Sequence, residues 1–365
     1  MDHVVINDKN VTHVTKKHKY MKKKIIAIVA GGDSSEHDVS MRSAEGISSW
    51  LDRSKYDVYT IEVRGLEWNA RLEDGSLSPV NRHDFSFEGM RSSIYSMQKT
   101  IKPDFVYITI HGTPGENGIL QGYFDLLQIP YSSCNLLVAA LTFDKFTLNQ
   151  YLKGFGVKIA ESILLRKGQE ITAEEVIGKV GLPCFIKPNG SGSSFGVTRC
   201  KSEADILPAI ETARKESADV MIESEIVGTE IANGVFRKAN GEVHVLPITE
   251  VASENEFFDY DAKYNGQVTE ITPARLSDDT TNRVKALTKA IYTILGGEGI
   301  MRVDYIIGHK QAEDGSQQDI INLLEINATP GMTATSFIPQ QARADGLEMS
   351  EILDEVINQK LGNAR

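Results

Sequence analysis

Two runs of consecutive apolar residues, each ending at a glycine-containing pair, constrain the fold of this chain most strongly. Residues 24–30 read KIIAIVA and precede Gly-Gly, and residues 104–110 read DFVYITI and precede His-Gly. Runs of this kind are typical of parallel strands buried on both faces. Residues 56–63 alternate as a third strand would. The sequence therefore predicts an α/β unit, in which functional sites gather where the strands end.

A helix is predicted between the strand at residues 24–30 and the strand at residues 56–63. Ala44, Ile47 and Leu51 recur at helical spacing. Three residues that favour helix caps precede them: Ser34, Ser35 and Asp38. The segment has no GxGxxG pattern, so the sequence does not support a dinucleotide-binding fingerprint.

The rest of the chain predicts two further units. The first has helices at residues 141–153, 173–180 and 203–216 and strands at residues 183–187, 195–200 and 220–223. The second is richer in strands, at residues 230–236, 243–248, 300–307 and 319–327, with a helix at residues 279–295. We place the boundaries near residues 133 and 223.

Composition and charge limit the partners and the compartment. The net charge of −11 disfavours nucleic acid, which needs a basic surface. Three cysteines without metal-binding spacing suit a reduced cytosolic protein, and Cys184 is expected to be a small buried hydrophobe. No apolar run reaches the length of about 18 residues that a membrane helix needs. Residues 1–20 lack the apolar segment of a signal peptide and are predicted to be a disordered tail.

Residues 187–197, KPNGSGSSFGV, place a lysine before a Gly/Ser-rich loop between two predicted strands. The backbone N–H groups and hydroxyls of such a loop could bind phosphates, with Lys187 as a charged partner. The stretch is not a Walker A motif, because GxxxxGK[ST] is absent. Considered alone, a loop of this composition is more often a plain hairpin turn.

The segments MRVDYII and NLLEINATPG carry polar residues within predicted strands. Residues two apart on a strand share a face, so Arg302 lies with Asp304, and Glu325 lies with Asn327. If the two strands pair as a hairpin, their oxygens form one cluster of the kind that Mg²⁺ prefers. The alternative is a surface ladder of salt bridges. We disfavour it because Glu325 and Asn327 interrupt an apolar run, where unpaired charge is costly.

Two more segments hold candidate residues with a structural alternative. Glu36, His37 and His111 follow predicted strands, and a carboxylate there could bind an ammonium group. His37 alone is more often structural or exposed than catalytic. His111 is better placed, and its alternative is a histidine that only orders the loop. The stretch FFDYDAKYNG, which includes Lys263 and Tyr264, is consistent with either a flap over a site or an ordinary surface loop.

Seven separated motifs, taken together and in order, resemble those of the ATP-grasp ligases, and among these the D-alanine–D-alanine ligase family. They are GGxSxEhxVS at residues 31–40, HGxxGEnGxxQG at 111–122, DK at 144–145, KPxxxGSSxGV at 187–197, YDxxxKY at 258–264, RxD at 302–304 and LExNxxPGMTxxS at 324–336. The resemblance extends from about residue 22 to residue 361.

The resemblance implies an α/β fold of three domains, the ATP-grasp fold with an N-terminal Rossmann-like preATP-grasp domain. The domains would be residues 21–133, a central ATP-grasp domain at 134–223 and a C-terminal domain at 224–365. ATP would lie between the last two, and residues 1–20 would be the tail. A cytoplasmic homodimer is expected, with no membrane or nucleic-acid partner.

The family resemblance also implies the ligands and their contacts. ATP would be held by Lys145 and Lys187 at the phosphates, Ser194 in the closing loop, Glu223 at the adenine amino group, Ile226 beside the base and Glu230 at the ribose. Two Mg²⁺ ions, or Mn²⁺ in their place, would be held by Asp304, Glu325 and Asn327.

The implied reaction joins two D-alanines through D-alanyl phosphate. Glu36, with Ser193 and Tyr264, would bind the ammonium of the first D-alanine, close to His111. Arg302 and the Gly331 N–H group would form the oxyanion hole. Ser336 and Lys263 would hold the carboxylate of the second D-alanine.

The sequence departs from the family pattern at Phe258, where the family often has Tyr, and in the loop GTPGENG after His111. Tyr264 favours dipeptide formation, because relatives that make D-alanyl-D-lactate tend to carry Phe there. Three alternatives stay open: a D-alanine–D-lactate ligase, another carboxylate–amine ligase of this fold, and a nucleotide-binding protein without activity. The MTxxS segment disfavours the second, and the full set of site residues disfavours the third.

Overall fold

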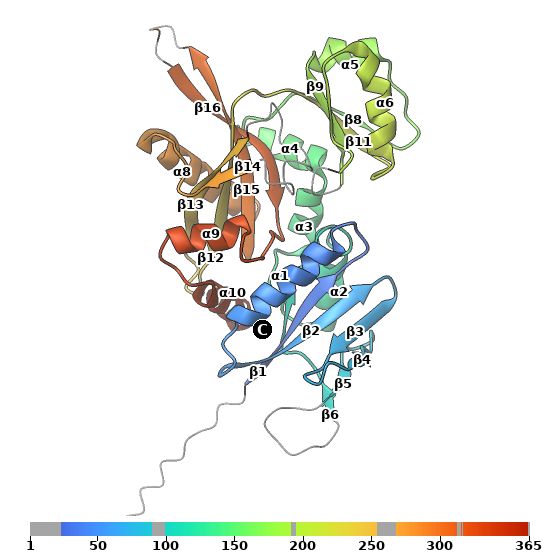
Figure 1. Cartoon of the computed structure of the whole chain (residues 1–365), viewed down its shortest axis with the longest axis vertical. Coiled ribbons are helices and arrows are strands. Elements are labelled where there is room, and N and C mark those ends of the chain that lie inside the picture. Colours follow the sequence, from blue (N-terminus) through green and yellow to red (C-terminus); the bar gives the residue numbers. More distant parts are fainter. Residues whose placement is uncertain are drawn as a thin grey trace, which may run out of the picture.

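The computed structural model describes residues 23–89, 99–190, 195–253, 268–311, 315 and 317–363. These residues form three sheets of four or five strands and one two-stranded sheet (Figure 1). The tail predicted at residues 1–20 lies outside the described residues. In the part of the chain that the structure describes, no helix combines the length and the apolar character needed to cross a lipid bilayer.

The N-terminal unit contains the predicted parallel strands. Its elements are β1 (Lys24–Gly31), α1 (His37–Trp50), β2 (Tyr56–Arg64), β3 (Glu67–Arg71), β4 (Leu77–Pro79), β5 (Phe87–Gly89), β6 (Lys99–Ile101), β7 (Phe105–Ile108) and α2 (Ile119–Leu127). The main sheet has the order β4-β3-β2-β1-β7, with β1 parallel to both β2 and β7. The three strands predicted from the apolar runs are therefore confirmed.

The predicted cap of the first helix is wrong. The residue at the N-cap of α1 is Glu36, whose side chain makes no capping hydrogen bond. Ser34 lies before the cap, and Asp38 lies inside the first turn. The Ser34 hydroxyl instead accepts a hydrogen bond from the Glu36 N–H group (3.2 Å) and donates one to the His111 carbonyl (2.9 Å). Ser34 therefore links the start of α1 to the loop that follows β7.

The central unit is a sheet covered by two helices on one face. It comprises β8 (Ser162–Leu165), α5 (Ala173–Val180), β9 (Cys184–Pro188), β10 (Thr198–Cys200), α6 (Glu203–Arg214) and β11 (Val220–Ser224). The sheet order is β10-β9-β11-β8, and all neighbouring strands are antiparallel. In Figure 1 this unit forms a lobe at one end of the molecule.

The C-terminal unit is a five-stranded antiparallel sheet with helices. It comprises β12 (Thr229–Arg237), β13 (Val243–Ser253), β14 (Val268–Ile271), α8 (Asp278–Ile294), β15 (Ile300–Gln311), β16 (Gln317–Asn327), α9 (Phe337–Ala344) and α10 (Met349–Asn363). The order is β14-β13-β12-β15-β16. The predicted pairing of the two segments around residues 302 and 325 is confirmed, because β15 and β16 are antiparallel neighbours.

The helix predicted at residues 141–153 is two helices, α3 (Leu136–Phe143) and α4 (Lys145–Lys153). The helix is interrupted at Asp144, whose backbone is extended with ψ of 93°. The Asp144 carboxylate accepts a hydrogen bond from the Thr147 N–H group at 2.9 Å and caps α4. The break places Lys145 in the first turn of α4, and the Lys145 N–H group donates to the Asn189 carbonyl at the end of β9.

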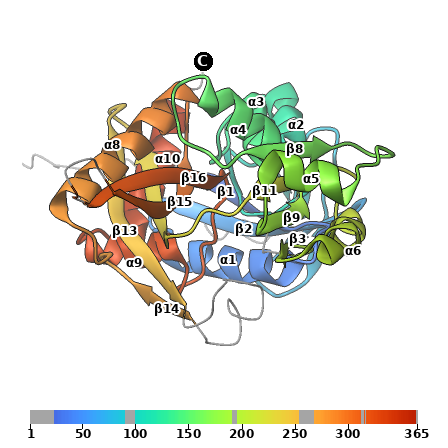
Figure 2. The ribbon, with the colours of Figure 1, turned by 90° about the horizontal axis from the view of Figure 1, so that it is seen from above.

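Two of the apolar cores join units that are far apart in sequence. One contains Ile28 and Phe105 of the N-terminal sheet together with Ile338 of α9 and Leu353 of α10. A second joins residues of α3 and α4 to the sheet that contains β15 and β16. The core of the central lobe is different, because its buried members run from Leu165 to Ile222 and come only from that segment. Figure 2 shows α2, α3 and α4 side by side, next to the central lobe.

Candidate active site

The loops that follow β1 and β7 are bound to each other at the ends of these strands. The Ser40 hydroxyl on α1 donates to the Thr109 carbonyl (2.7 Å) and accepts from the Gly31 N–H group (2.9 Å). With the Ser34 contacts, these bonds hold Glu36 and His111 on neighbouring loops. The residues predicted at two separate strand ends therefore meet at one edge of the sheet.

Arg302, Asp304, Glu325 and Asn327 form one cluster on β15 and β16, as predicted. In the strand register Asp304 lies opposite Glu325, and Arg302 lies opposite Asn327. The Arg302 guanidinium binds the Asp304 carboxylate through two nitrogens, at 2.8 Å and 2.6 Å. The Asn327 amide nitrogen donates to Asp304 at 3.2 Å and lies 3.5 Å from Glu325. A surface ladder does not describe this cluster, because Asp304 is buried and Arg302 is mostly buried.

The cluster fits a divalent cation with oxygen ligands. Two carboxylates and one amide lie within hydrogen-bonding reach of one another, and a half-turn of the Asn327 amide presents its oxygen in place of its nitrogen. Across the described residues, no group of three or more His, Cys, Asp or Glu side chains forms a complete metal site. A cation here would therefore take its other ligands from phosphate oxygens and water, as Mg²⁺ commonly does.

Two lysines predicted to contact phosphates are each paired with a predicted site carboxylate. Lys187 on β9 and Glu223 on β11 form a buried ion pair, with Nζ 2.5 Å from Oε1. Lys145 lies with its Nζ 3.6 Å from Oε2 of Glu325. Burying either charge alone would be costly, so each partner stabilises the other in a site of low dielectric.

His111 is buried, and one of its ring nitrogens has no hydrogen-bond partner. The ring hydrogen-bonds to the Thr329 backbone, and the Nε2 atom is buried without a partner. Burial lowers the pKa of His111, the negative charge of Glu36 opposes this shift, and Arg302 reinforces it. The imidazole is therefore neutral near pH 7 and presents Nε2 as an acceptor.

Glu116 is a site residue that the sequence analysis did not single out. Its carboxylate accepts a hydrogen bond from the Gly112 N–H group at 2.8 Å. Burial, followed by the nearby charge of Glu36, raises the pKa of Glu116 to about 8. Lys145 and Glu325 also act on it electrostatically, so Glu116 borders both the Glu36 loop and the β15–β16 cluster. Its place in the motif after His111 was the available signal, but that motif was assigned to His111 alone.

Gly331 and Ser336 lie together in the turn between β16 and α9. A Cβ atom at position 331 would lie 3.0 Å from the Ser336 hydroxyl. That hydroxyl accepts from the Thr333 N–H group (3.0 Å) and lies 2.8 Å from the Thr333 hydroxyl. The Arg302 guanidinium packs over the ring of Phe337, 5.1 Å from its centre, which connects this turn to the cluster.

The other predicted nucleotide contacts line the junction between the central lobe and β12. Ile226 is half-buried in the connection that follows β11, and it lies near Gly308 of β15. Glu230 is half-buried on β12 and acts electrostatically on Arg302. Four predicted site residues lie outside the described residues: Ser193, Ser194, Lys263 and Tyr264.

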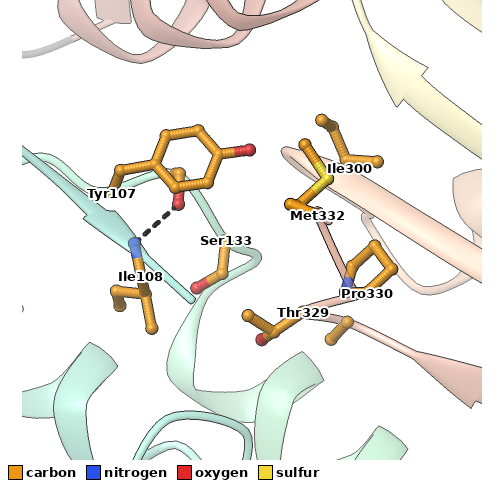
Figure 3. Close-up of a pocket in the computed structure, with 9 residues that line it drawn as sticks. Tyr107, Ile108, Ser133, Ile300, Thr329, Pro330 and Met332 are labelled. Carbon is orange, nitrogen blue, oxygen red and sulfur yellow. Dashed lines mark hydrogen bonds between the residues drawn. The ribbon is translucent and has the colours of Figure 1, made fainter. Parts of the chain in front are cut away.

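A small cavity lies where the end of β7 meets the turn after β16 (Figure 3). Its volume is about 10 Å³, and Tyr107, Ser133, Ile300, Thr329 and Met332 are among the residues that line it. This volume is comparable to that of one water molecule and cannot admit a substrate. The cavity marks the seam between the N-terminal and C-terminal units, next to the Thr329 carbonyl that binds His111.

Comparison with known families decides what kind of protein has this site. Residues 25–134 match the family profile described as D-ala D-ala ligase N-terminus, and residues 151–358 match D-ala D-ala ligase C-terminus. The chain belongs to the D-alanine–D-alanine ligase family. Its fold is accordingly the ATP-grasp fold, as the resemblance of the motifs implied.

Relatives and solved structures are similar over nearly the whole chain. Proteins named D-alanine–D-alanine ligase from Phocaeicola vulgatus and Parabacteroides distasonis are 59% and 53% identical, over 93% and 94% of this chain and 99% of each relative. The structure of the VanG D-Ala:D-Ser ligase from Enterococcus faecalis matches with a TM-score of 0.78 and 29% identity, over 93% of this chain and 100% of that one. The Bacillus anthracis D-alanine–D-alanine ligase complexed with ATP matches with a TM-score of 0.69 and 26% identity, over 93% and 98%.

Proposed function

We propose that this protein uses ATP to join two D-alanines into D-alanyl-D-alanine, a precursor of peptidoglycan. The observation that carries the proposal is the convergence of Glu36, His111, Arg302 and Glu325 from loops and strands of two units. Such a site can hold an ammonium group, a carboxylate and a phosphoryl group next to one another. A pure nucleotide-binding protein would have no use for the Glu36 and His111 side of it.

ATP binds between the central lobe and the β15–β16 hairpin. Its phosphates become the partners of the two lysines. They replace Glu223 as the partner of Lys187 and Glu325 as the partner of Lys145. Glu223 is then available to the adenine amino group, Ile226 packs beside the base and Glu230 binds the ribose. Ser194 in the Gly/Ser loop contacts the phosphates.

Asp304, Glu325 and Asn327 would hold two Mg²⁺ ions, or Mn²⁺ in their place. The ions would supply positive charge that stabilises the negative charge on the transferred phosphoryl group. Arg302 would stay beside Asp304 through the contacts of its Nε and Nη2 atoms, and its positive charge would be available to the substrate. Arg302 is thereby held in place without losing its charge.

In the first step the carboxylate of one D-alanine attacks the γ-phosphorus of ATP, which yields D-alanyl phosphate and ADP. Glu36, with Ser193 and Tyr264, binds the ammonium group of this D-alanine. His111 is neutral and orients the substrate through Nε2. The role of the protein is to place the reacting oxygen in line with the phosphorus and to exclude water.

In the second step the amine of another D-alanine attacks the acyl carbon, and phosphate leaves through a tetrahedral intermediate. Arg302 and the Gly331 N–H group stabilise the oxyanion. Ser336 and Lys263 hold the carboxylate of the second D-alanine. Since Gly331 and Ser336 lie against each other in one turn, the oxyanion hole and the second carboxylate are positioned by the same element.

The reaction is tested by measuring phosphate release from ATP and Mg²⁺ with D-alanine, L-alanine, or D-alanine together with D-lactate or D-serine. We expect release that depends on D-alanine, with D-alanyl-D-alanine identified by mass. Faster release with D-lactate or D-serine, with the mixed product, would move the function to a different second substrate. ATP binding without release in any mixture would leave the alternative of a non-catalytic binder.

The protein is further proposed to be a homodimer of the cytoplasm that pairs through α2 and α3. Leu126 on α2 is 86% exposed and Leu137 on α3 is 71% exposed, and Ile119 and Leu136 on the same two helices are also exposed. Adjacent exposed aliphatic side chains are typical of surfaces that bind another protein. We expect Leu126→Glu with Leu137→Glu to give a monomer by light scattering. Leu66→Glu, at a similarly exposed site in the turn between β2 and β3, is the control and should leave the mass unchanged.

A further inference from the structure

The central lobe contains two cysteines that the proposed function does not use. Cys184 on β9 and Cys200 on β10 are directly opposite each other in the antiparallel register. Both are fully buried, and both belong to the core beneath α5 and α6, so their side chains are on the same face of the sheet. Both are free thiols in the structure, as is the third cysteine, Cys134.

The geometry of this pair is compatible with a disulfide. Opposite residues of antiparallel strands have Cα atoms about 4.5 to 5.5 Å apart, and disulfides occur at Cα separations of about 4.4 to 6.8 Å. Their Cβ atoms are about 4.5 to 5.5 Å apart in a strand pair and about 3.8 Å apart in a disulfide. The side chains of Cys184 and Cys200 are hydrogen-bonded to each other. Because the Cβ separation typical of opposite residues exceeds that of a disulfide by about 1 Å, a bond between Cys184 and Cys200 would draw β10 slightly closer to β9.

The position of β10 gives a reagent a route to the pair. β10 is an edge strand, since it ends the order β10-β9-β11-β8, and it is held by three residue pairs. Short edge strands separate from a sheet at lower free-energy cost than central strands. Separation of β10 from β9 would open the edge of the sheet at which Cys184 and Cys200 face each other.

We propose that Cys184 and Cys200 form a reversible intramolecular disulfide by exchange with small-molecule disulfides, and that this bond weakens ATP binding. The thiolate of Cys184 attacks one sulfur of the reagent and releases the first small thiol. The thiolate of Cys200 then attacks the Cys184 sulfur and releases the second. Two electrons and two protons pass from the protein to the reagent, which becomes two thiols. A hydrogen bond from the Cys200 thiol lowers the pKa of Cys184, which favours Cys184 as the first nucleophile.

The effect on ATP follows from the neighbours of the two cysteines. Lys187 lies on the same five-residue strand as Cys184 and is paired with Glu223. Arg199 precedes Cys200, and its Nε lies 2.6 Å from Oε1 of Glu225, next to Ile226. Drawing β9 and β10 together would therefore shift Lys187 relative to Glu223 and Arg199 relative to Glu225. Both ion pairs lie on the side of the lobe where we propose that ATP binds. The inference rests on the proposed function only for this ATP effect.

The test treats the full-length protein with oxidised glutathione under native conditions and measures intact mass and linked peptides. We expect a mass lower by two hydrogen atoms and a peptide that joins Cys184 to Cys200. Both should be absent in Cys184→Ala and in Cys200→Ala and present in Cys134→Ala, the matched buried control. If a variant does not fold, the peptide that links Cys184 to Cys200 in the oxidised wild type still tests the proposal. Stable glutathione adducts at either cysteine, or no reaction, would refute the disulfide.

The second measurement compares the Kd for a non-hydrolysable ATP analogue in the oxidised and dithiothreitol-reduced protein. We expect a several-fold higher Kd in the oxidised form, restored by reduction, with no change after the same treatment of Cys200→Ala. An unchanged Kd in fully oxidised protein would overturn the proposal. Because mass and analogue binding do not depend on turnover, failure of the ligase assay would remain distinguishable from failure of this inference.

Discussion

Single residues at this site carry charges that depend on their neighbours. Lys187 and Lys145 each have a carboxylate partner, and Arg302 has Asp304. Glu116 differs from them, because its carboxyl group is buried near the negative charge of Glu36. Carboxyl groups in such surroundings favour the protonated form. We therefore expect substitutions of these charged residues to change the chemistry and its dependence on pH.

Replacing Glu116 by Gln should make folding stability less dependent on pH. Burial and Glu36 raise the pKa of Glu116 to about 8, above its ordinary value of 4.5. The folded state thus retains a proton that the unfolded state loses, and stability falls as pH rises between these values. We expect the variant to gain about 2 kcal/mol over wild type between pH 5 and pH 8. Urea denaturation without nucleotide measures it. Parallel pH curves for the two proteins would contradict the assignment.

Replacing Glu325 by Ala should lower turnover by about 100-fold or more, because it removes a proposed metal ligand and the partner of Lys145. Dipeptide formation at saturating ATP measures the effect. Asp319→Asn, on the same strand but paired with His309 at the surface, is the control and should retain activity. Near-wild-type product formation by Glu325→Ala would disprove the metal assignment.

Replacing Ser336 by Ala should raise KM for the second D-alanine by about tenfold, because a hydrogen bond to a charged group is lost. KM for the first D-alanine should change less. Steady-state kinetics over a wide range of D-alanine concentration separates the two constants. Equal changes in both would be inconsistent with a role at the second carboxylate.

The candidate residues were predictable to different degrees. Arg302, Asp304, Glu325 and Asn327 could be grouped from sequence because strand alternation fixes which side chains share a face. Glu116 belongs to the motif after His111, but its raised pKa could not be predicted from the sequence, because it comes from burial and from the charge of Glu36, which lies far away in the sequence. The ion pair of Lys187 and Glu223 likewise depends on the pairing of β9 with β11.

At the scale of elements, the break between α3 and α4 determines where Lys145 lies. Apolar spacing continues across this break, so sequence periodicity predicts one helix. The break depends on Asp144 and on the contact of Lys145 with Asn189, which only the folded chain brings together. The strands were easier to predict, because buried parallel strands leave long apolar runs. The cap of α1 was missed because Ser34 bonds to His111 instead.

Replacing Asp144 by Ala should cost about 1 kcal/mol of stability through loss of the cap of α4. It should also raise KM for ATP, because Lys145 is the first residue of that helix. Thr172→Ala removes the capping box of α5 in the central lobe and is the matched control. It should cost a similar free energy without changing KM for ATP. If both variants changed KM equally, the position of Lys145 would not depend on the cap.

At the scale of the whole molecule, the first and last units of the chain share an apolar core, whereas the central lobe has its own. The sequence could suggest three units near boundaries 133 and 223, which we retain as a proposal. It could not show that α10 packs against α1 and the first sheet, since that contact joins residues about 300 positions apart.

We therefore expect amide hydrogen exchange to reveal two cooperative units. Residues 162–224 should open at a lower free energy than strands β1, β7 and β15, because fewer apolar residues are buried in the lobe. ATP with Mg²⁺ should slow exchange in the lobe more than in β1. Identical opening free energies throughout would show that the lobe is not a separate unit.

The core of the central lobe comes from one uninterrupted stretch of chain, and this has an evolutionary consequence. A gene segment that encodes such a stretch can be replaced or duplicated by a single recombination event without dividing another core. The N-terminal unit lacks this freedom, because its buried face is completed by helices encoded at the other end of the gene. Changes in nucleotide binding by the central lobe could therefore be acquired by replacing one gene segment. The N-terminal and C-terminal units, which share a core, must instead change together.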